Sequence, residues 1–206
     1  MALPLGTVGR GRYTPLNADS TKNPERLLAL RGQKGATWFV NSGVSSSGNG
    51  LSWGDAFETL SEAEAKALAG DLILVAEGHS ETLAAALAFD VAGVHVIGLG
   101  VGDRRPVFTF SATAAQIDLD AAGIVLENLV FKNGVDAQTI VIDINSTDCA
   151  VRYCELREGS SAQWTTGIDI NGGASNACDG TQIIGCTIYS ISAGAGRGLF
   201  TALFAA

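Results

Sequence analysis

The stretch Ile142-Asp143-Ile144-Asn145 decides the fold of this chain, because its pattern occurs three times. The other copies are Ile117-Asp118-Leu119-Asp120 and Ile168-Asp169-Ile170-Asn171, so successive copies begin 25 and 26 residues apart. Short alternating segments that recur at this period are typical of a solenoid, in which each coil of chain stacks on the previous coil. The sequence therefore predicts a stack of short β-strands.

Strand geometry predicts which side chains of this repeat are exposed. Successive side chains of a strand point to opposite faces, so the polar residues face outward if the isoleucines face inward. Equivalent positions on neighbouring coils lie about 4.8 Å apart. The expected outward column is Asp118, Asp143 and Asp169, above the buried residues Ile117, Ile142 and Ile168.

Further segments extend the repeat in both directions. A second pattern runs from Asn128-Leu129-Val130 to Cys154-Glu155-Leu156, again 26 residues on. Residues 71–75 and 94–99 supply earlier coils, and residues 182–188 repeat the second pattern after an insertion. The 206 residues are 47% hydrophobic, which is enough for one domain with a real core. We therefore expect an all-β chain that forms a parallel β-helix solenoid of about five coils, with the coils spanning 71–190 of a domain at 36–206.

Residues 36–70 are expected to cover the first coil. A short strand at Thr37–Asn41 is followed by a polar loop and then by a helix. The expected apolar face of that helix consists of Phe57, Leu60, Ala67 and Leu68, and Gly70 is a plausible stop.

The order Trp53, Ala56-Phe57, Gly70-Asp71 and Glu81 resembles the N-terminal cap of right-handed parallel β-helix proteins of the pectate-lyase-like superfamily. There a helix covers the open end of the core, so the resemblance implies a right-handed solenoid with an N-terminal capping helix. Three later stretches resemble β-helix proteins encoded by tailed bacteriophages and prophages, namely Val96–Gly100, Arg105–Phe110 and Ile124–Phe131. The resemblance covers residues 36 to about 190.

Charge divides the chain into two parts. Residues 1–35 hold six basic and two acidic residues, and the rest of the chain holds seven basic and nineteen acidic residues. A basic, proline-punctuated segment ahead of an acidic body predicts an extended arm that binds an acidic protein surface, an anionic polymer or nucleic acid. The alternative is a solvated tail. The residues expected to bind a partner are Leu3, Leu5, Arg10, Arg12, Tyr13, Leu16, Lys22 and Arg26.

The C-terminal segment 191–206 is apolar but too short to span a bilayer. We expect it to cover the open end of the helix or to enter a subunit interface. Its expected contact residues are Leu199, Phe200, Leu203 and Phe204.

The aspartate column is the strongest argument for an enzyme. Paired carboxylates suit a glycosidase, and stacked oxygens can hold Ca²⁺. The plainer interpretation is that exposed strand positions carry polar residues that keep the body soluble. A lyase would need a cationic base, but Lys132, Arg152 and Arg157 do not fall on the column, and aromatic residues do not cluster there. We therefore predict no enzyme activity, no catalytic residue, no metal site and no cofactor.

The cysteines and histidines give weaker evidence for a functional site. The four cysteines lack the spacing of a zinc site, and free thiols are expected. Cys154 and Cys186 occupy matching strand positions. His79 is expected to make hydrogen bonds in a turn or cap.

Two functions are expected from these observations. The first is a capsid decoration (cement) protein of a tailed phage, a structural virion protein bound through its arm to the major capsid protein or another virion protein. The second is a phage tail spike or receptor-binding protein that binds or cleaves polysaccharide. No signal peptide is recognisable, so we expect synthesis in the bacterial cytoplasm and a final place on the virion. A homotrimer is expected, with no membrane and no specific nucleic acid as partner.

Overall fold

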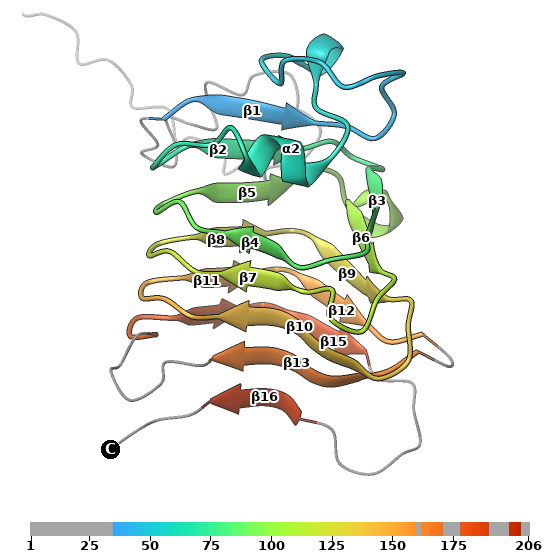
Figure 1. Ribbon diagram of the computed structural model, residues 1–206, viewed down its shortest axis with the longest axis vertical. Coiled ribbons are helices and arrows are strands. Elements are labelled where there is room, and N and C mark those ends of the chain that lie inside the picture. The colour runs from blue at the N-terminus through green and yellow to red at the C-terminus, as the bar shows by residue number, and fades with distance from the viewer. Residues whose placement is uncertain (1–34, 160–161, 171–177, 190–197, 203–206) are drawn as a thin grey trace, which may run out of the picture.

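The computed structural model describes residues 35–159, 162–170, 178–189 and 198–202. These residues form a parallel β-helix built from three sheets, here called A, B and C (Figure 1). All pairings between its named strands are parallel. The chain makes about four turns, and each turn passes through sheets A, B and C in that order. The predicted all-β parallel β-helix is confirmed, with about four turns where about five were expected.

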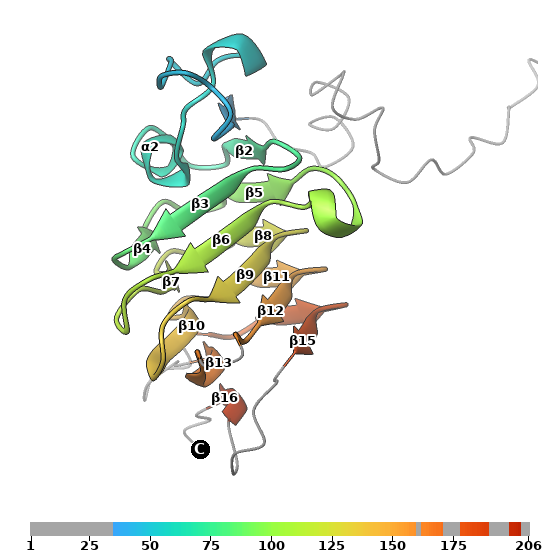
Figure 2. The ribbon, with the colours of Figure 1, turned by 90° about the vertical axis from the view of Figure 1, so that its right-hand side faces the viewer.

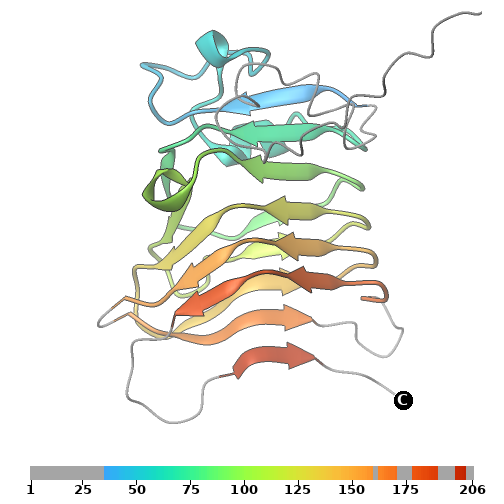
Figure 3. The ribbon, with the colours of Figure 1, turned by 180° about the vertical axis from the view of Figure 1, so that it is seen from behind.

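Each sheet is a column of strands that come from successive turns of the chain. Sheet A contains β1 (Thr37–Val40), β2 (Leu72–Val75), β5 (His95–Gly98), β8 (Val125–Glu127), β11 (Ala150–Arg152) and β14 (Gln182–Ile184). Sheet B contains β3 (Ser80–Leu83), β6 (Val107–Phe110), β9 (Val130–Asn133), β12 (Glu155–Arg157) and β15 (Thr187–Tyr189). Sheet C contains β4 (Leu87–Phe89), β7 (Ile117–Leu119), β10 (Gln138–Ile144), β13 (Trp164–Ile170) and β16 (Gly198–Ala202). Figure 2 faces sheet B and Figure 3 faces sheet A.

The corner from sheet C to sheet A explains why glycines recur along the chain. Gly70, Gly93 and Gly123 stack there, each with positive φ, and each amide donates to a carbonyl of the next turn. Glycine adopts this left-handed conformation without steric cost. Asp148 follows them with φ 58°, because aspartate tolerates this region better than most residues. The stacked corners hold successive turns in register.

The core is a continuous apolar column enclosed by the three sheets. Phe108 and Phe131 occupy equivalent inward positions of sheet B, with ring centroids 6.0 Å apart, and Phe110 stacks on Phe131 at 6.2 Å. All three side chains are buried. Removing one such ring costs about 3–5 kcal/mol, so this stack is a main source of stability.

The corner from sheet A to sheet B corrects the second sequence pattern by one residue. Val130 pairs with Glu155, which is a step of 25 residues and not 26. Asn128 (φ 59°) and Tyr153 (φ 52°) both turn the chain at this corner, so they occupy equivalent positions. The buried residues that follow, Leu129 and Cys154, then align as well. Turn geometry, which the apolar pattern does not encode, sets this alignment.

The N-terminal end of the stack is covered as expected, but by a shorter helix. Helix α2 (Leu60–Glu64) lies over the sheet C side of the first turn (Figure 1). It begins with a capping box between Thr59 and Glu62, and Leu60, Ala63 and Ala67 are buried. A 3-10 helix, η2 (Trp53–Asp55), precedes it. Within the described residues no helix is long and apolar enough to cross a membrane.

The prediction that Leu68 belongs to the apolar face of this helix is wrong. The Leu68 side chain is 71% exposed. The helix ends at Glu64, and the Leu68 amide donates to Asp71 Oδ2 at 2.8 Å, which turns the chain toward β2. Leu68 lies beyond the end of the helix, so the helical spacing of apolar residues does not predict its burial.

Candidate functional site: the aspartate column of sheet C

The aspartate column lies on the outer face of sheet C. Asp118, Asp143 and Asp169 are direct register partners on β7, β10 and β13. The column is bounded by Ala88 on β4 and Thr201 on β16. All three aspartates are partly exposed, while Ile117, Ile142 and Ile168 are buried. The predicted column is confirmed.

Burial and neighbouring carboxylates perturb the protonation of Asp118 and Asp143. Partial burial is the main cause that raises the pKa of Asp143 above its usual range, and the charges of Asp118, Asp169 and Asp120 raise it further, against a hydrogen bond with Asn145. Burial also raises the pKa of Asp118, although Gln116 Nε2 donates to Asp118 Oδ1 at 2.5 Å. Like charges this close favour the neutral acid or a bound cation. The column can therefore accept protons, cations or donor groups.

The three basic residues considered as a lyase base do not lie on the aspartate column, as the sequence predicted. Lys132 is on β9 and Arg157 on β12, both in sheet B, while Arg152 is on β11 in sheet A. No group of three or more histidine, cysteine or acidic side chains with a metal-binding arrangement occurs in the part of the chain that the structure describes.

Sheet B carries a second column that the sequence analysis did not find. Thr109, Lys132, Arg157 and Tyr189 are register partners on β6, β9, β12 and β15, and we call them the basic column. Lys132 is exposed and the Tyr189 side chain is 53% exposed. The signal was the step of 25 residues from Lys132 to Arg157, which equals the first step of the aspartate repeat.

An ion-pair chain orients Arg157 in the basic column. Arg157 Nε donates to Glu155 Oε1, and Glu155 Oε2 lies 3.3 Å from an Arg105 guanidinium nitrogen. Arg105 also donates to the carbonyls of Leu129 and Tyr153, at 2.9 and 2.6 Å. Because Arg105 and Glu155 are largely buried, they give Arg157 a defined position on the sheet.

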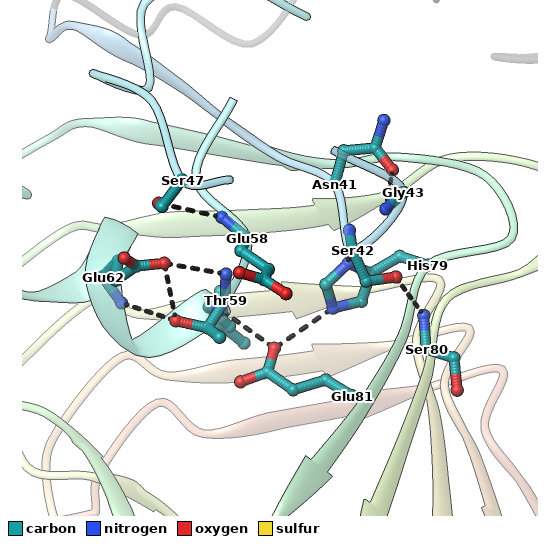
Figure 4. Close-up of polar contacts among 11 residues, drawn as sticks. Asn41, Ser42, Gly43, Ser47, Glu58, Thr59, Glu62, His79, Ser80 and Glu81 are labelled. Carbon is teal, nitrogen blue, oxygen red and sulfur yellow. Dashed lines mark hydrogen bonds and ion pairs between the residues drawn. The ribbon is translucent and has the colours of Figure 1, made fainter. Parts of the chain in front are cut away.

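His79 joins the cap to the first turn (Figure 4). Its ring is buried, and its Nδ1 accepts a hydrogen bond of 2.9 Å from the Ser42 amide. The other ring nitrogen therefore carries the proton and faces Glu81 Oε2 at 3.1 Å. Glu81 Oε2 also accepts from the Leu60 amide, at the start of α2. The predicted structural role of His79 in a turn or cap is confirmed.

Ser42, His79 and Glu81 do not form a nucleophilic triad. Nδ1 of His79 binds the amide of Ser42 and not its hydroxyl group, and that hydroxyl accepts a hydrogen bond from the Ser80 amide at 2.9 Å. A general base must contact the proton that it removes from the nucleophile. These residues hold the cap together.

Asp71 has a similar structural role at the other end of the cap. Its carboxylate accepts hydrogen bonds from the Ala36 amide at 2.6 Å and the Trp38 indole at 2.8 Å, besides the Leu68 amide. The residue is only 3% exposed. Asp71 and Glu81, two residues of the stretch that resembles a β-helix cap, therefore stabilise the cap.

The four cysteines are free thiols, as expected. Cys154 and Cys186 precede the paired strands β12 and β15, which confirms their matching positions. Burial raises the pKa of the Cys154 thiol to about 12, so it is unreactive at neutral pH.

The predicted contact residues at the two ends of the chain remain predictions. The whole set from Leu3 to Arg26 lies outside the described residues, as do Leu203 and Phe204. Leu199 and Phe200 belong to β16, where Phe200 is the register partner of Ile168. The fold thus continues as paired strand into the C-terminal segment. No known protein family, curated protein or solved structure matches the chain.

Proposed function

We propose that this protein is a structural virion protein, a decoration (cement) protein on the capsid of a tailed phage. The observation that carries the proposal is the division of charge: residues 1–35 have a net charge of +4 and the remaining residues a net charge of −12. A compact acidic body and a basic segment suit attachment to a large acidic shell, because the segment is attracted to the surface that repels the body. The resemblance of residues 96–131 to phage β-helix proteins supports the same setting.

The cap contacts support an attachment role for residues 1–35 that is separate from folding. Among the described residues, Asp71, His79 and Glu81 bind groups at Ala36, Trp38, Ser42, Leu60 and Leu68, and these contacts join the cap to the first turn. The β-helix should therefore fold without residues 1–35. In this proposal Arg10, Arg12 and Arg26 supply electrostatic attraction, and apolar residues such as Leu3 and Tyr13 supply the part that resists salt.

The test is to add purified protein to undecorated capsids and count the bound copies. A chain that starts at residue 36 should keep its circular dichroism spectrum and lose binding. Arg10→Ala/Arg12→Ala should weaken binding more at low salt than at high salt. The matched control is Lys66→Ala/Arg104→Ala, which removes two exposed charges from the body. Full binding by the shortened chain would reject the proposal.

A second candidate, a tail spike that cleaves polysaccharide, is favoured by one observation. Asp118 and Asp143 are paired on adjacent strands, and the pKa of each carboxyl group is raised. Strand spacing of about 4.8 Å is near the carboxylate separation of a retaining glycosidase, and a raised pKa suits a general acid. The assay is release of reducing ends from bacterial surface polysaccharides, with Asp143→Asn as the inactive control.

A further inference from the structure

The aspartate column and the basic column face away from different sides of the same solenoid. Sheet C carries the aspartate column and sheet B the basic column, and these two sheets adjoin through the turn between β9 and β10 (Figures 1 and 2). The aspartate column thus presents three carboxylates, and the basic column presents Lys132 and Arg157, of which Arg157 is paired with Glu155 beside it. One molecule cannot bring them together, because both point outward from its own core.

The charges on the two faces also occur on the same turns. Lys132 on β9 and Asp143 on β10 belong to one turn, and Arg157 on β12 and Asp169 on β13 belong to the next. Both columns repeat with the strand spacing of about 4.8 Å. Any arrangement that places the two faces in contact at equal height therefore aligns two pairs of opposite charges at once.

We propose that copies of this chain associate side by side, with the basic column of one copy against the aspartate column of the next. Rotation about an axis parallel to the solenoid leaves each turn at its own height. Lys132 then faces Asp143 of the neighbouring copy, and Arg157 faces Asp169. This contact joins different faces of the two copies, so a suitable rotation closes it into a ring. The homotrimer expected from the sequence is one such ring.

The local structure favours a second copy as the occupant of these faces. Asp143 is repelled by the carboxylates of Asp118 and Asp169, and no described cation of the same copy lies on the aspartate column. A cation from a second copy opposite Asp143 would offset this repulsion. Arg157 is already oriented by Glu155, so less side-chain entropy is lost on association. Tyr189 extends the basic column with an exposed aromatic ring, and tyrosine and arginine are enriched at protein interfaces.

The experiment is sedimentation velocity on the full chain at micromolar concentration, with charge reversal at one pair. Lys132→Glu and Asp143→Lys should each shift the protein toward single copies, with at least about a tenfold weaker association, since each replaces an attraction by a repulsion. The double variant Lys132→Glu/Asp143→Lys should restore assembly. Lys66→Glu, at an exposed site on the cap, is the matched control and should assemble like the wild type.

Several outcomes would overturn the proposal. They are a wild-type chain that sediments as single copies, a folded Lys132→Glu variant that assembles normally, and a folded double variant that stays dissociated. If Asp143→Lys fails to fold, the exposed Lys132→Glu substitution and the milder Arg157→Gln still test the basic column. The readout is independent of the proposed capsid attachment, because single copies could still bind capsids and a ring could fail to do so.

Discussion

Replacing His79 by alanine should loosen the cap while leaving the lower turns intact. The substitution removes the acceptor of the partly buried Ser42 amide, and leaving such a donor unpaired costs about 1–3 kcal/mol. It also removes a buried ring that lies 5.3 Å from the Phe108 ring, centroid to centroid, and the resulting cavity adds to the cost. We expect a total loss of about 3 kcal/mol in the stability of the cap.

The assay is amide hydrogen exchange, because a solenoid can open at one end without unfolding as a whole. A loss of about 3 kcal/mol corresponds to roughly a hundredfold faster exchange where exchange requires opening of the cap. The affected segments should be β1 and α2, and β9 and β12 should change little.

Ser42→Ala is the matched control for this experiment. It removes only the hydroxyl acceptor of the Ser80 amide, which lies at an exposed site, so it should cost under about 1.5 kcal/mol. The reasoning fails if His79→Ala accelerates exchange in the cap no more than Ser42→Ala does. It also fails if ¹⁵N spectra of the imidazole place the proton on Nδ1.

Three further predictions concern the column, a corner and a thiol. Asp143→Asn should raise the free energy of unfolding at pH 7 by about 1 kcal/mol. The Asp143 carboxyl group stabilises the folded state most below its unfolded pKa near 3.9, and this stabilisation is lost as pH rises through its raised folded pKa. The gain should vanish below about pH 4 in urea unfolding curves recorded in the Lys132→Glu background, and a gain that persists there would contradict the argument. Gly98→Ala should cost about 1–3 kcal/mol, since the added Cβ would lie 2.4 Å from the Asn128 carbonyl oxygen, whereas Gly54→Ala meets nothing closer than 3.8 Å and should be nearly neutral by the same measurement. Cys154 should resist iodoacetamide at pH 8 until the protein unfolds, and mass spectrometry that found it modified first among the four thiols would refute its burial.

The repeat of the aspartate column was readable from the sequence because it combines two local properties. Alternation of side chains within a strand is fixed by backbone geometry, and the separation of 25 and 26 residues sets which strands stack. The outward position of Asp143 and the burial of Ile142 both follow from these two facts. The matching positions of Cys154 and Cys186 followed from a similar repeat, whereas the expected role of His79 rested on its place in the first turn.

The corner alignment and the end of the capping helix were not readable in this way. The step from Val130 to Glu155 depends on Asn128 and Tyr153, two unlike residues that adopt the same left-handed conformation. Leu68 is exposed because Asp71 captures its amide and ends the helical path. The corner depends on backbone conformation, and the exposure of Leu68 goes with a hydrogen bond between its amide and the Asp71 side chain. Neither feature leaves an apolar periodicity in the sequence.

The sequence by itself determined that this chain is a stack of short parallel strands with an acidic column on one face. Tertiary structure alone decided which residues of the aspartate column and the basic column lie on the same turn. Lys132 and Asp143 are eleven residues apart and carry no common pattern. They lie on the same turn but on different faces because the chain bends between β9 and β10, and the position of that bend is set by packing against the turns above and below.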